Sequence, residues 1–367
     1  MTQLDGISRA PIRVLIPRLP PVPALLPYLN RIDTNRYYSN YGPLSREFGA
    51  RLCALTGAGG VTLTCNGTSA IELALRALDR PSGGLCLMPS FTFIASAHEV
   101  CNAGLTPFLV EVDTDTMMLT PAIAEAAIRH MPTAPAAVLV VSAFGARPDF
   151  RGWADFEEEY GIPVVFDAAA AVTSLAGYVG RQPVCVSLHA TKVLGVGEGG
   201  AILSADTALI ERTTAMTGFG FVGSDRTATI RGGNYRPSEY TAAIGLAAMD
   251  SLPDRIEELK TMTAAYRARM ANKAAMLQPG VGDGWVTMTL NVVLPAEEVV
   301  ATVDRLTSAG IEWRRWWGLG CHTHPAFAAL PRTDLSATDA LAPCVIGVPF
   351  HDGVSGDDID RIVACLP

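Results

Sequence analysis

The stretch SLHATKVLGVGEGGAIL (residues 187–203) contains Lys192, one of only three lysines among 367 residues. It starts in one predicted strand and ends in another, with a glycine-rich turn between them. Short β-branched segments predict seven strands: 61–65, 85–89, 107–112, 137–143, 163–167, 184–188 and 200–203. Helical patterns alternate with these strands, which is typical of parallel strands covered by helices on both faces.

Two of the intervening helices have clear signals. Thr120 suits an N-cap and Pro121 the first helical position, which predicts a helix over 120–131. The segment 68–78 is apolar nearly all round, so we expect that helix to be largely buried. Its polar start then requires a reason.

The last third of the chain has a different pattern of helix and strand signals. A long helical stretch, 238–276, is interrupted at Pro253. Beyond it we predict a strand, a helix, a strand and a helix at 285–294, 297–310, 344–350 and 357–366. The sequence thus predicts a large α/β domain over 1–250 and a small α+β domain over 251–367.

Composition excludes several classes of function. The net charge of -8 argues against a general nucleic-acid or membrane-surface binder, because such binding relies on Lys and Arg. The eight cysteines are scattered without a CxxC pair, so we expect neither a disulfide framework nor a metal site. The first residues lack a basic and apolar leader and no later segment is long enough to span a bilayer, so we expect a cytoplasmic protein.

Lys192 differs from the other two lysines, which lie in the polar part of a predicted helix. Its apolar setting disfavours the ammonium form and so favours the free amine that a Schiff base requires. The alternative is a lysine that snorkels from the end of a strand.

Asp167 ends the predicted strand 163–167 and is followed by four alanines. A carboxylate at the carboxyl end of a central parallel strand lies where α/β sheets bind ligands. Such a group can keep the ring nitrogen of pyridoxal phosphate protonated, so that the ring accepts electrons. The alternative is that Asp167 caps the next helix.

The loop NGTSA (66–70) joins a strand to the buried helix. Unpaired N–H groups at a helix start, a glycine and the hydroxyls of Thr68 and Ser69 suit a phosphate, and Ser187 could add another hydroxyl. Plain N-capping by Thr68 or Ser69 is the alternative. Phe93, in PSFTF (89–93), could lie on a planar ring, although core packing is the commoner role of a phenylalanine.

Taken in order, the segments NGTSAIELAL, MPSFTFIASA, FDAAAA, SLHATKVLGVGEGGAI and GGNYRPSEYTAAIGL resemble the DegT/DnrJ/EryC1/StrS family of sugar aminotransferases. The resemblance covers nearly the whole chain, from YGPLSREFGARL (41–52) to VPFHDGVSGDDIDRIV (348–363). It implies the fold of type I pyridoxal-phosphate enzymes, as in aspartate aminotransferase.

The resemblance also implies roles for individual residues. Lys192 would bind the cofactor and carry the proton, and Asp167 would pair with the pyridine nitrogen. Phe93 would stack on the ring, while Thr68, Ser69 and Ser187 would bind the phosphate. Asn234 would reach the cofactor phosphate of a neighbouring subunit, which implies a homodimer with shared sites.

The implied reaction moves an amino group from a donor, usually L-glutamate, to a keto sugar linked to dTDP, UDP or GDP. Arg314 and His322 match a C-terminal segment that lies near the substrate in such enzymes. Arg314 suits the donor carboxylate or the sugar diphosphate, because its planar fork fits either anion. Surface solvation is the alternative for Arg314.

One departure from the family pattern is Ala170, which stands where the family usually has glutamine. The change allows a second hypothesis: the same cofactor with another substrate or chemistry, such as dehydration or amination of a non-sugar ketone. A catalytically silent regulatory member is a third hypothesis, which Lys192 and Asp167 disfavour.

Overall fold

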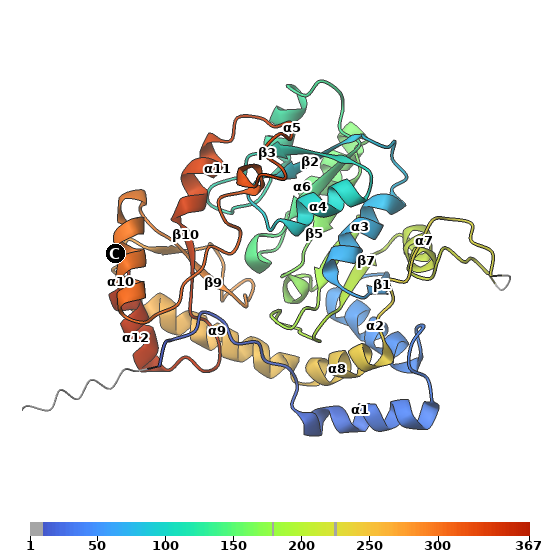
Figure 1. The fold of residues 1–367 in the computed structure, drawn as a ribbon, viewed down its shortest axis with the longest axis horizontal. Coiled ribbons are helices and arrows are strands. Elements are labelled where there is room, and N and C mark those ends of the chain that lie inside the picture. Colours follow the sequence, from blue (N-terminus) through green and yellow to red (C-terminus); the bar gives the residue numbers. More distant parts are fainter. Residues whose placement is uncertain (1–9, 178–179, 224–225) are drawn as a thin grey trace, which may run out of the picture.

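The computed structural model describes residues 10–177, 180–223 and 226–367. A seven-stranded sheet forms the centre of the fold (Figure 1), with the strand order β1-β7-β6-β5-β4-β2-β3. Its strands are β1 Gly60–Thr64, β2 Leu85–Pro89, β3 Thr106–Val110, β4 Ala137–Val141, β5 Val164–Asp167, β6 Val184–Ser187 and β7 Gly200–Ser204. β7 runs antiparallel to both of its neighbours, and the other neighbouring pairs are parallel. The predicted α/β class and all seven predicted strands are confirmed, with ends that differ by one or two residues.

Helices cover both faces of this sheet. The helices of this part of the chain, including α9 at its end, are α1 Val22–Asn35, α2 Pro43–Thr56, α3 Gly67–Ala77, α4 Ala95–Asn102, α5 Pro121–Ile128, α6 Phe150–Tyr160, α7 Thr207–Thr217, α8 Glu239–Asp250 and α9 Leu252–Arg269. Of these, α1 packs against α8 rather than on the sheet. In β4, Val138 and Val140 pack into the cluster beneath α2, α5 and α6, whereas Leu139 packs with α3 and α4 on the opposite face. Burial on both faces explains why the strand reads as an unbroken apolar run.

The predicted helix signals agree with the structure at most points. The hydroxyl of Thr120 accepts a hydrogen bond from the backbone N–H of Ile123, as expected of an N-cap. The long predicted helix is two helices that meet at Ser251, because Pro253 lies in the first turn of α9.

The C-terminal part holds a three-stranded antiparallel sheet in the order β10-β9-β8. Its elements are β8 Met276–Leu277, β9 Leu290–Val293, α10 Val299–Ser308, α11 Ser336–Leu341, β10 Val345–Val348 and α12 Gly356–Ala364. The predicted strand over 285–294 is too long. Residues before β9 form turns instead, since Gly282 donates to the carbonyl of Trp285 at 2.7 Å and the Thr287 hydroxyl bonds to the carbonyls of Phe144 and Thr289.

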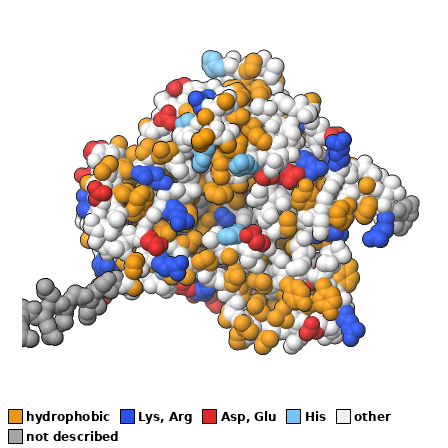
Figure 2. Space-filling model, viewed as in Figure 1, with side chains coloured by type: hydrophobic (Ala, Val, Ile, Leu, Met, Phe, Trp, Pro, Cys, Tyr) orange, Lys and Arg blue, Asp and Glu red, His pale blue; other side chains and the backbone are white. Residues whose placement is uncertain are grey.

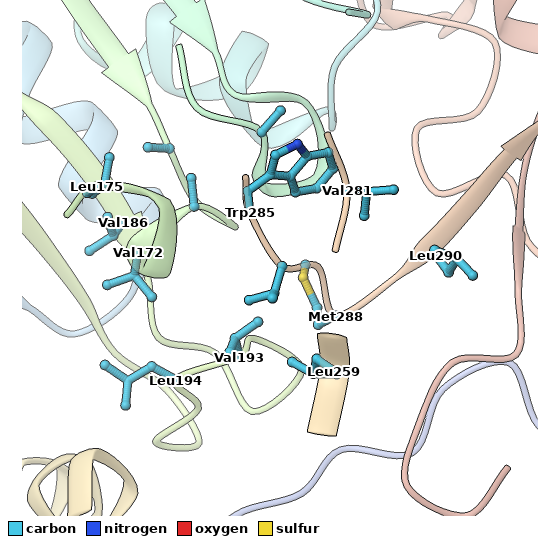
Figure 3. Close-up of a cluster of buried hydrophobic side chains, with 14 of the residues drawn as sticks. Val172, Leu175, Val186, Val193, Leu194, Leu259, Val281, Trp285, Met288 and Leu290 are labelled. Carbon is cyan, nitrogen blue, oxygen red and sulfur yellow. The ribbon is translucent and has the colours of Figure 1, made fainter. Parts of the chain in front are cut away.

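One hydrophobic cluster joins the two parts of the chain. Figure 3 shows Trp285 and Met288 of the C-terminal part gathered with Val172 and Val193 of the first part and Leu259 of α9. The division into domains at residue 250 therefore stays a prediction.

The structure also bears on membrane spans and on the state of the cysteines. Among the described residues, none of the helices combines the length and apolar character needed to cross a bilayer. All eight cysteines have free thiols.

Candidate active site

A cavity of about 410 Å³ opens beside the carboxyl ends of β4 and β5 and the start of α3. Its size falls within the range of small-molecule sites. Its walls are largely apolar, and its polar lining includes Asn66, Thr68, Thr92, Ser142, Asp167, Ser187, His189, Thr191, Lys192, Glu198 and Thr289. Five residues of the predicted site therefore meet here: Thr68, Phe93, Asp167, Ser187 and Lys192.

Lys192 lies in the turn that follows β6, where its backbone N–H donates to the carbonyl of His189 at 2.8 Å. Its side chain lines the cavity. Burial lowers the pKa of the Lys192 amine, and the nearby Asp167 carboxylate opposes that shift. The amine thus has the environment that a nucleophilic lysine requires.

Asp167 is the last residue of β5, and only 5% of it is exposed. Its Oδ2 accepts a 2.7 Å hydrogen bond from the Ser96 hydroxyl, and its Oδ1 accepts one of 3.2 Å from the backbone N–H of Ala169. Burial raises the pKa of this carboxyl, while the two hydrogen bonds and Lys192 act in the opposite direction. Ser96 is part of the site that the sequence analysis missed.

The start of α3 forms another wall of the cavity. The side chain of Asn66 caps this helix by accepting from the N–H of Ser69 at 2.7 Å, so the alternative of capping by Thr68 or Ser69 is wrong. Thr68 is exposed and lines the cavity, whereas Ser69 does not and has its hydroxyl 3.5 Å from the Cys65 sulfur. A Cβ on Gly67 would lie 2.6 Å from the Cβ of Ser187, so only glycine allows this close approach.

Aromatic side chains line the remaining walls. Phe93 is 56% exposed and borders the cavity, so the alternative of core packing is wrong. Phe144, Trp316 and Trp317 also line the cavity. The rings of Phe144 and Trp317 stack with their centroids 4.0 Å apart. The sequence analysis did not single out these last three residues.

The other predicted residues do not border this cavity. Asn234 is exposed, and its Oδ1 accepts from Arg236 at 3.1 Å. Arg314 is exposed, with its guanidinium carbon 5.2 Å from the centroid of the Trp316 ring. His322 is bonded on both ring nitrogens, to Ser90 at 2.7 Å and to Asp339 at 2.8 Å. Their roles toward substrate or a neighbouring subunit stay predictions.

The residues that line the cavity fit pyridoxal phosphate. Asp167 is a buried carboxylate, and such a charge is costly unless a cation or several donors face it. A protonated ring nitrogen would be that cation, Lys192 offers the amine, and the N-terminus of α3 with Thr68 and Ser187 suits the phosphate. Bound there, the cofactor supplies an electron sink for carbanion chemistry.

Comparison with known proteins gives the same assignment. The model of the DegT/DnrJ/EryC1/StrS aminotransferase family matches residues 24–367. GDP-perosamine synthase of Caulobacter vibrioides is 30% identical over 353 residues, which cover 92% of this chain and 93% of that protein. Protein Rv3402c of Mycobacterium tuberculosis is also 30% identical, over 92% of this chain and 84% of its own length.

Solved structures share the whole fold. The structure of DesI with its TDP-sugar product is 29% identical, with a TM-score of 0.86 over 97% of this chain and 92% of that one. This chain therefore belongs to the DegT/DnrJ/EryC1/StrS aminotransferase family and is a pyridoxal-phosphate-dependent aminotransferase of fold type I.

Proposed function

We propose that this enzyme transfers an amino group from L-glutamate to the keto carbon of a hexose linked to dTDP, UDP or GDP. The observation that carries the proposal is that Lys192 and Asp167 border one cavity with Phe93 and the start of α3. GDP-perosamine synthase and DesI, both similar over most of the chain, are named for nucleotide-sugar chemistry, which supports a substrate of this class.

Each residue has a defined task in this proposal. The amine of Lys192 moves a proton to and from the reacting substrate carbon, since burial favours its neutral form. Asp167 holds a proton on the ring nitrogen, and Ser96 keeps the carboxylate oriented. The aromatic walls exclude water from the reacting atoms.

Absorption spectroscopy of the holoenzyme tests the proposal. Addition of L-glutamate should bleach the absorption band of the Lys192-bound cofactor, and a nucleotide-linked keto sugar should then restore it. The panel consists of dTDP-, UDP- and GDP-linked keto hexoses, and Lys192→Ala, which lacks the band, is the control. Bleaching by glutamate without recovery with any of these sugars would contradict the sugar substrate.

Ala170 supports the second hypothesis of a non-sugar ketone. It borders the cavity with a methyl group, where the family usually has a polar amide, and this leaves room beside the cofactor for a different acceptor. Recovery of the band with a non-sugar ketone alone would favour that alternative.

We further propose a homodimer. Hydrophobic side chains gather over α1 and α8 (Figure 2), including Val22 and Leu26, which are 67% and 49% exposed. Phe219 and Val222, at 47% and 55%, are exposed in the same loop region as Asn234. Exposed apolar patches of this kind mark protein interfaces, and a second copy would bring Asn234 to a neighbouring cofactor phosphate.

The proposed location is the cytoplasm. Free thiols at all eight cysteines suit a reducing compartment.

A further inference from the structure

Three polar atoms lie together beside the active-site cavity without a hydrogen-bond partner among the described residues. They are Oγ1 of Thr289, Oδ1 of Asn291 and Nε1 of Trp316. Thr289 and Asn291 are only 7% and 5% exposed, and Thr289 and Trp316 line the cavity. Buried polar atoms are nearly always paired, so three such atoms at one place indicate a missing partner.

The C-terminal sheet brings these atoms together. Asn291 of β9 pairs with Gly347 of β10, and Gly347 in turn exchanges backbone hydrogen bonds with Arg314. Directly opposite residues of antiparallel strands have their side chains on the same face. A Cβ on Gly347 would lie 2.1 Å from Nε1 of Trp316, so glycine leaves the indole seated next to Asn291.

Thr289 belongs to the same group because it lines the cavity together with Trp316 and contacts Asn291 through its backbone carbonyl. The amide nitrogen of Asn291 donates to the carbonyl of Thr289 at 3.1 Å. That bond orients the amide, and the amide oxygen has no hydrogen-bond partner among the described residues. The group therefore offers one N–H donor, one carbonyl acceptor and one hydroxyl.

We infer that Thr289, Asn291 and Trp316 bind a ring hydroxyl of the acceptor sugar, a role that rests on the proposed function. A sugar hydroxyl accepts from an indole N–H while it donates to an amide oxygen, which this group requires. Phe144 and Trp317, stacked at 4.0 Å, border the same cavity and offer an apolar wall to the sugar ring. Such a site discriminates strongly against a substrate that lacks the hydroxyl, because its buried polar groups are then left unpaired.

The donor carboxylate fits this group poorly. A carboxylate accepts hydrogen bonds only, and it would face the Asn291 oxygen. Arg314 is exposed, and its guanidinium carbon lies over the Trp316 ring, 5.2 Å from the ring centroid. An anion bound by Arg314 would thus lie outside the three-residue group.

The test compares two half-reactions of the holoenzyme in Trp316→Phe and Thr289→Val. Thr289→Val keeps the side-chain shape and removes the hydroxyl, whereas Trp316→Phe keeps an aromatic ring and removes the indole N–H. GDP-perosamine and dTDP-4-amino-4,6-dideoxy-D-glucose serve as amino-sugar probes, and L-glutamate as the other donor. Each variant should lower kcat/KM for the reactive amino sugar about tenfold more than for L-glutamate, as expected for the loss of one buried hydrogen bond. Trp313→Phe, whose indole bonds to Thr307 at 3.2 Å outside the cavity, should leave the ratio unchanged.

Deoxy analogues of the reactive probe, lacking the 2- or the 3-hydroxyl, complete the design. The wild type should discriminate against one of them, and Trp316→Phe should lose most of that discrimination. Equal effects of the variants on both half-reactions, or undiminished discrimination, would overturn the inference and indicate that solvent fills the group. If neither amino sugar reacts with the wild type while L-glutamate does, the proposed sugar substrate fails, and the inference fails with it.

Discussion

The hydroxyl of Ser96 donates a 2.7 Å hydrogen bond to Oδ2 of Asp167, and both residues are buried. Ser96 lies at the start of α4 and also bonds to the Thr92 hydroxyl at 2.9 Å. The turn that carries Phe93 is therefore tied to the carboxylate at the end of β5. This hydrogen bond favours the ionised form of Asp167 and fixes the orientation of its carboxylate.

Ser96→Ala should weaken cofactor binding. The hydrogen bond from Ser96 lowers the pKa of Asp167, so its loss lets burial raise that pKa further. A bond to a charged group contributes about 1.5–3 kcal/mol, which predicts a loss of affinity of about tenfold or more. Titration of the apoenzyme with pyridoxal phosphate measures this, with the exposed Ser82→Ala as control. An affinity equal to that of the control would show that Ser96 has no such role.

Capture of the cofactor by the apoenzyme should become faster as pH rises. The neutral amine is the nucleophile, and burial lowers the pKa of Lys192 from the usual value of 10.5. The half-maximal rate should therefore lie below pH 10.5, and below that of a free lysine derivative measured with the same cofactor. In Asp167→Asn the midpoint should fall further, since the carboxylate raises the pKa of Lys192. A midpoint that matches the free derivative would contradict the buried environment of the amine.

Gly67→Ala should disrupt the end of the cavity that we propose binds the cofactor phosphate. The new methyl group would lie 2.6 Å from Cβ of Ser187, so α3 or the strand end must shift. Misplaced helix N–H groups lose contacts to the phosphate, and we expect at least about a tenfold loss of cofactor affinity. Inorganic phosphate should compete with the cofactor for this end of the cavity, and cofactor fluorescence follows the competition. Weaker binding of phosphate as well as of the cofactor would locate the damage at this end. Unchanged binding of both cofactor and phosphate would remove the start of α3 from the site.

Mixed subunits test the shared site. Lys192→Ala and Asn234→Ala should each be defective alone, but one site of the hybrid dimer would combine an intact Lys192 with the partner subunit's Asn234. Refolding or coexpression of the two variants should thus recover activity. Lys192→Ala mixed with Asp167→Asn is the matched control, because both changes affect the same chain's half of the site. Recovery in neither mixture, or full activity of a monomer by sizing, would argue against the shared site.

Local sequence predicts the position of a candidate residue where a strand or a helix begins or ends next to it. Asp167 ends one buried strand and Lys192 lies shortly after another, and the carboxyl ends of parallel strands meet at one edge of a sheet. The start of α3 was likewise predicted, although the capping residue is Asn66 rather than a hydroxyl residue. Ala170 departs from the family pattern, and nothing in the neighbouring residues indicates this by itself.

Contacts between distant segments could not be predicted in the same way. Ser96 and Asp167 are 71 residues apart, and their bond depends on the packing of α4 against the sheet. The group of Thr289, Asn291 and Trp316 depends on the register of β9 and β10. The strand predicted over 285–294 was too long because hydrogen bonds of Thr287 and Trp285 to loops replace the sheet ladder there. The alternation of apolar residues in that segment does not indicate that loop contacts replace the strand pairing.

We propose that Lys192 is the residue that binds the cofactor. Borohydride reduction of the holoenzyme, followed by peptide mass spectrometry, fixes the cofactor to whichever lysine holds it, and the chain has only Lys192, Lys260 and Lys273. We predict one reduced pyridoxyl group per chain, on the peptide containing Lys192. A label on Lys260 or Lys273 instead, or no label on a protein that retains activity, would contradict the account.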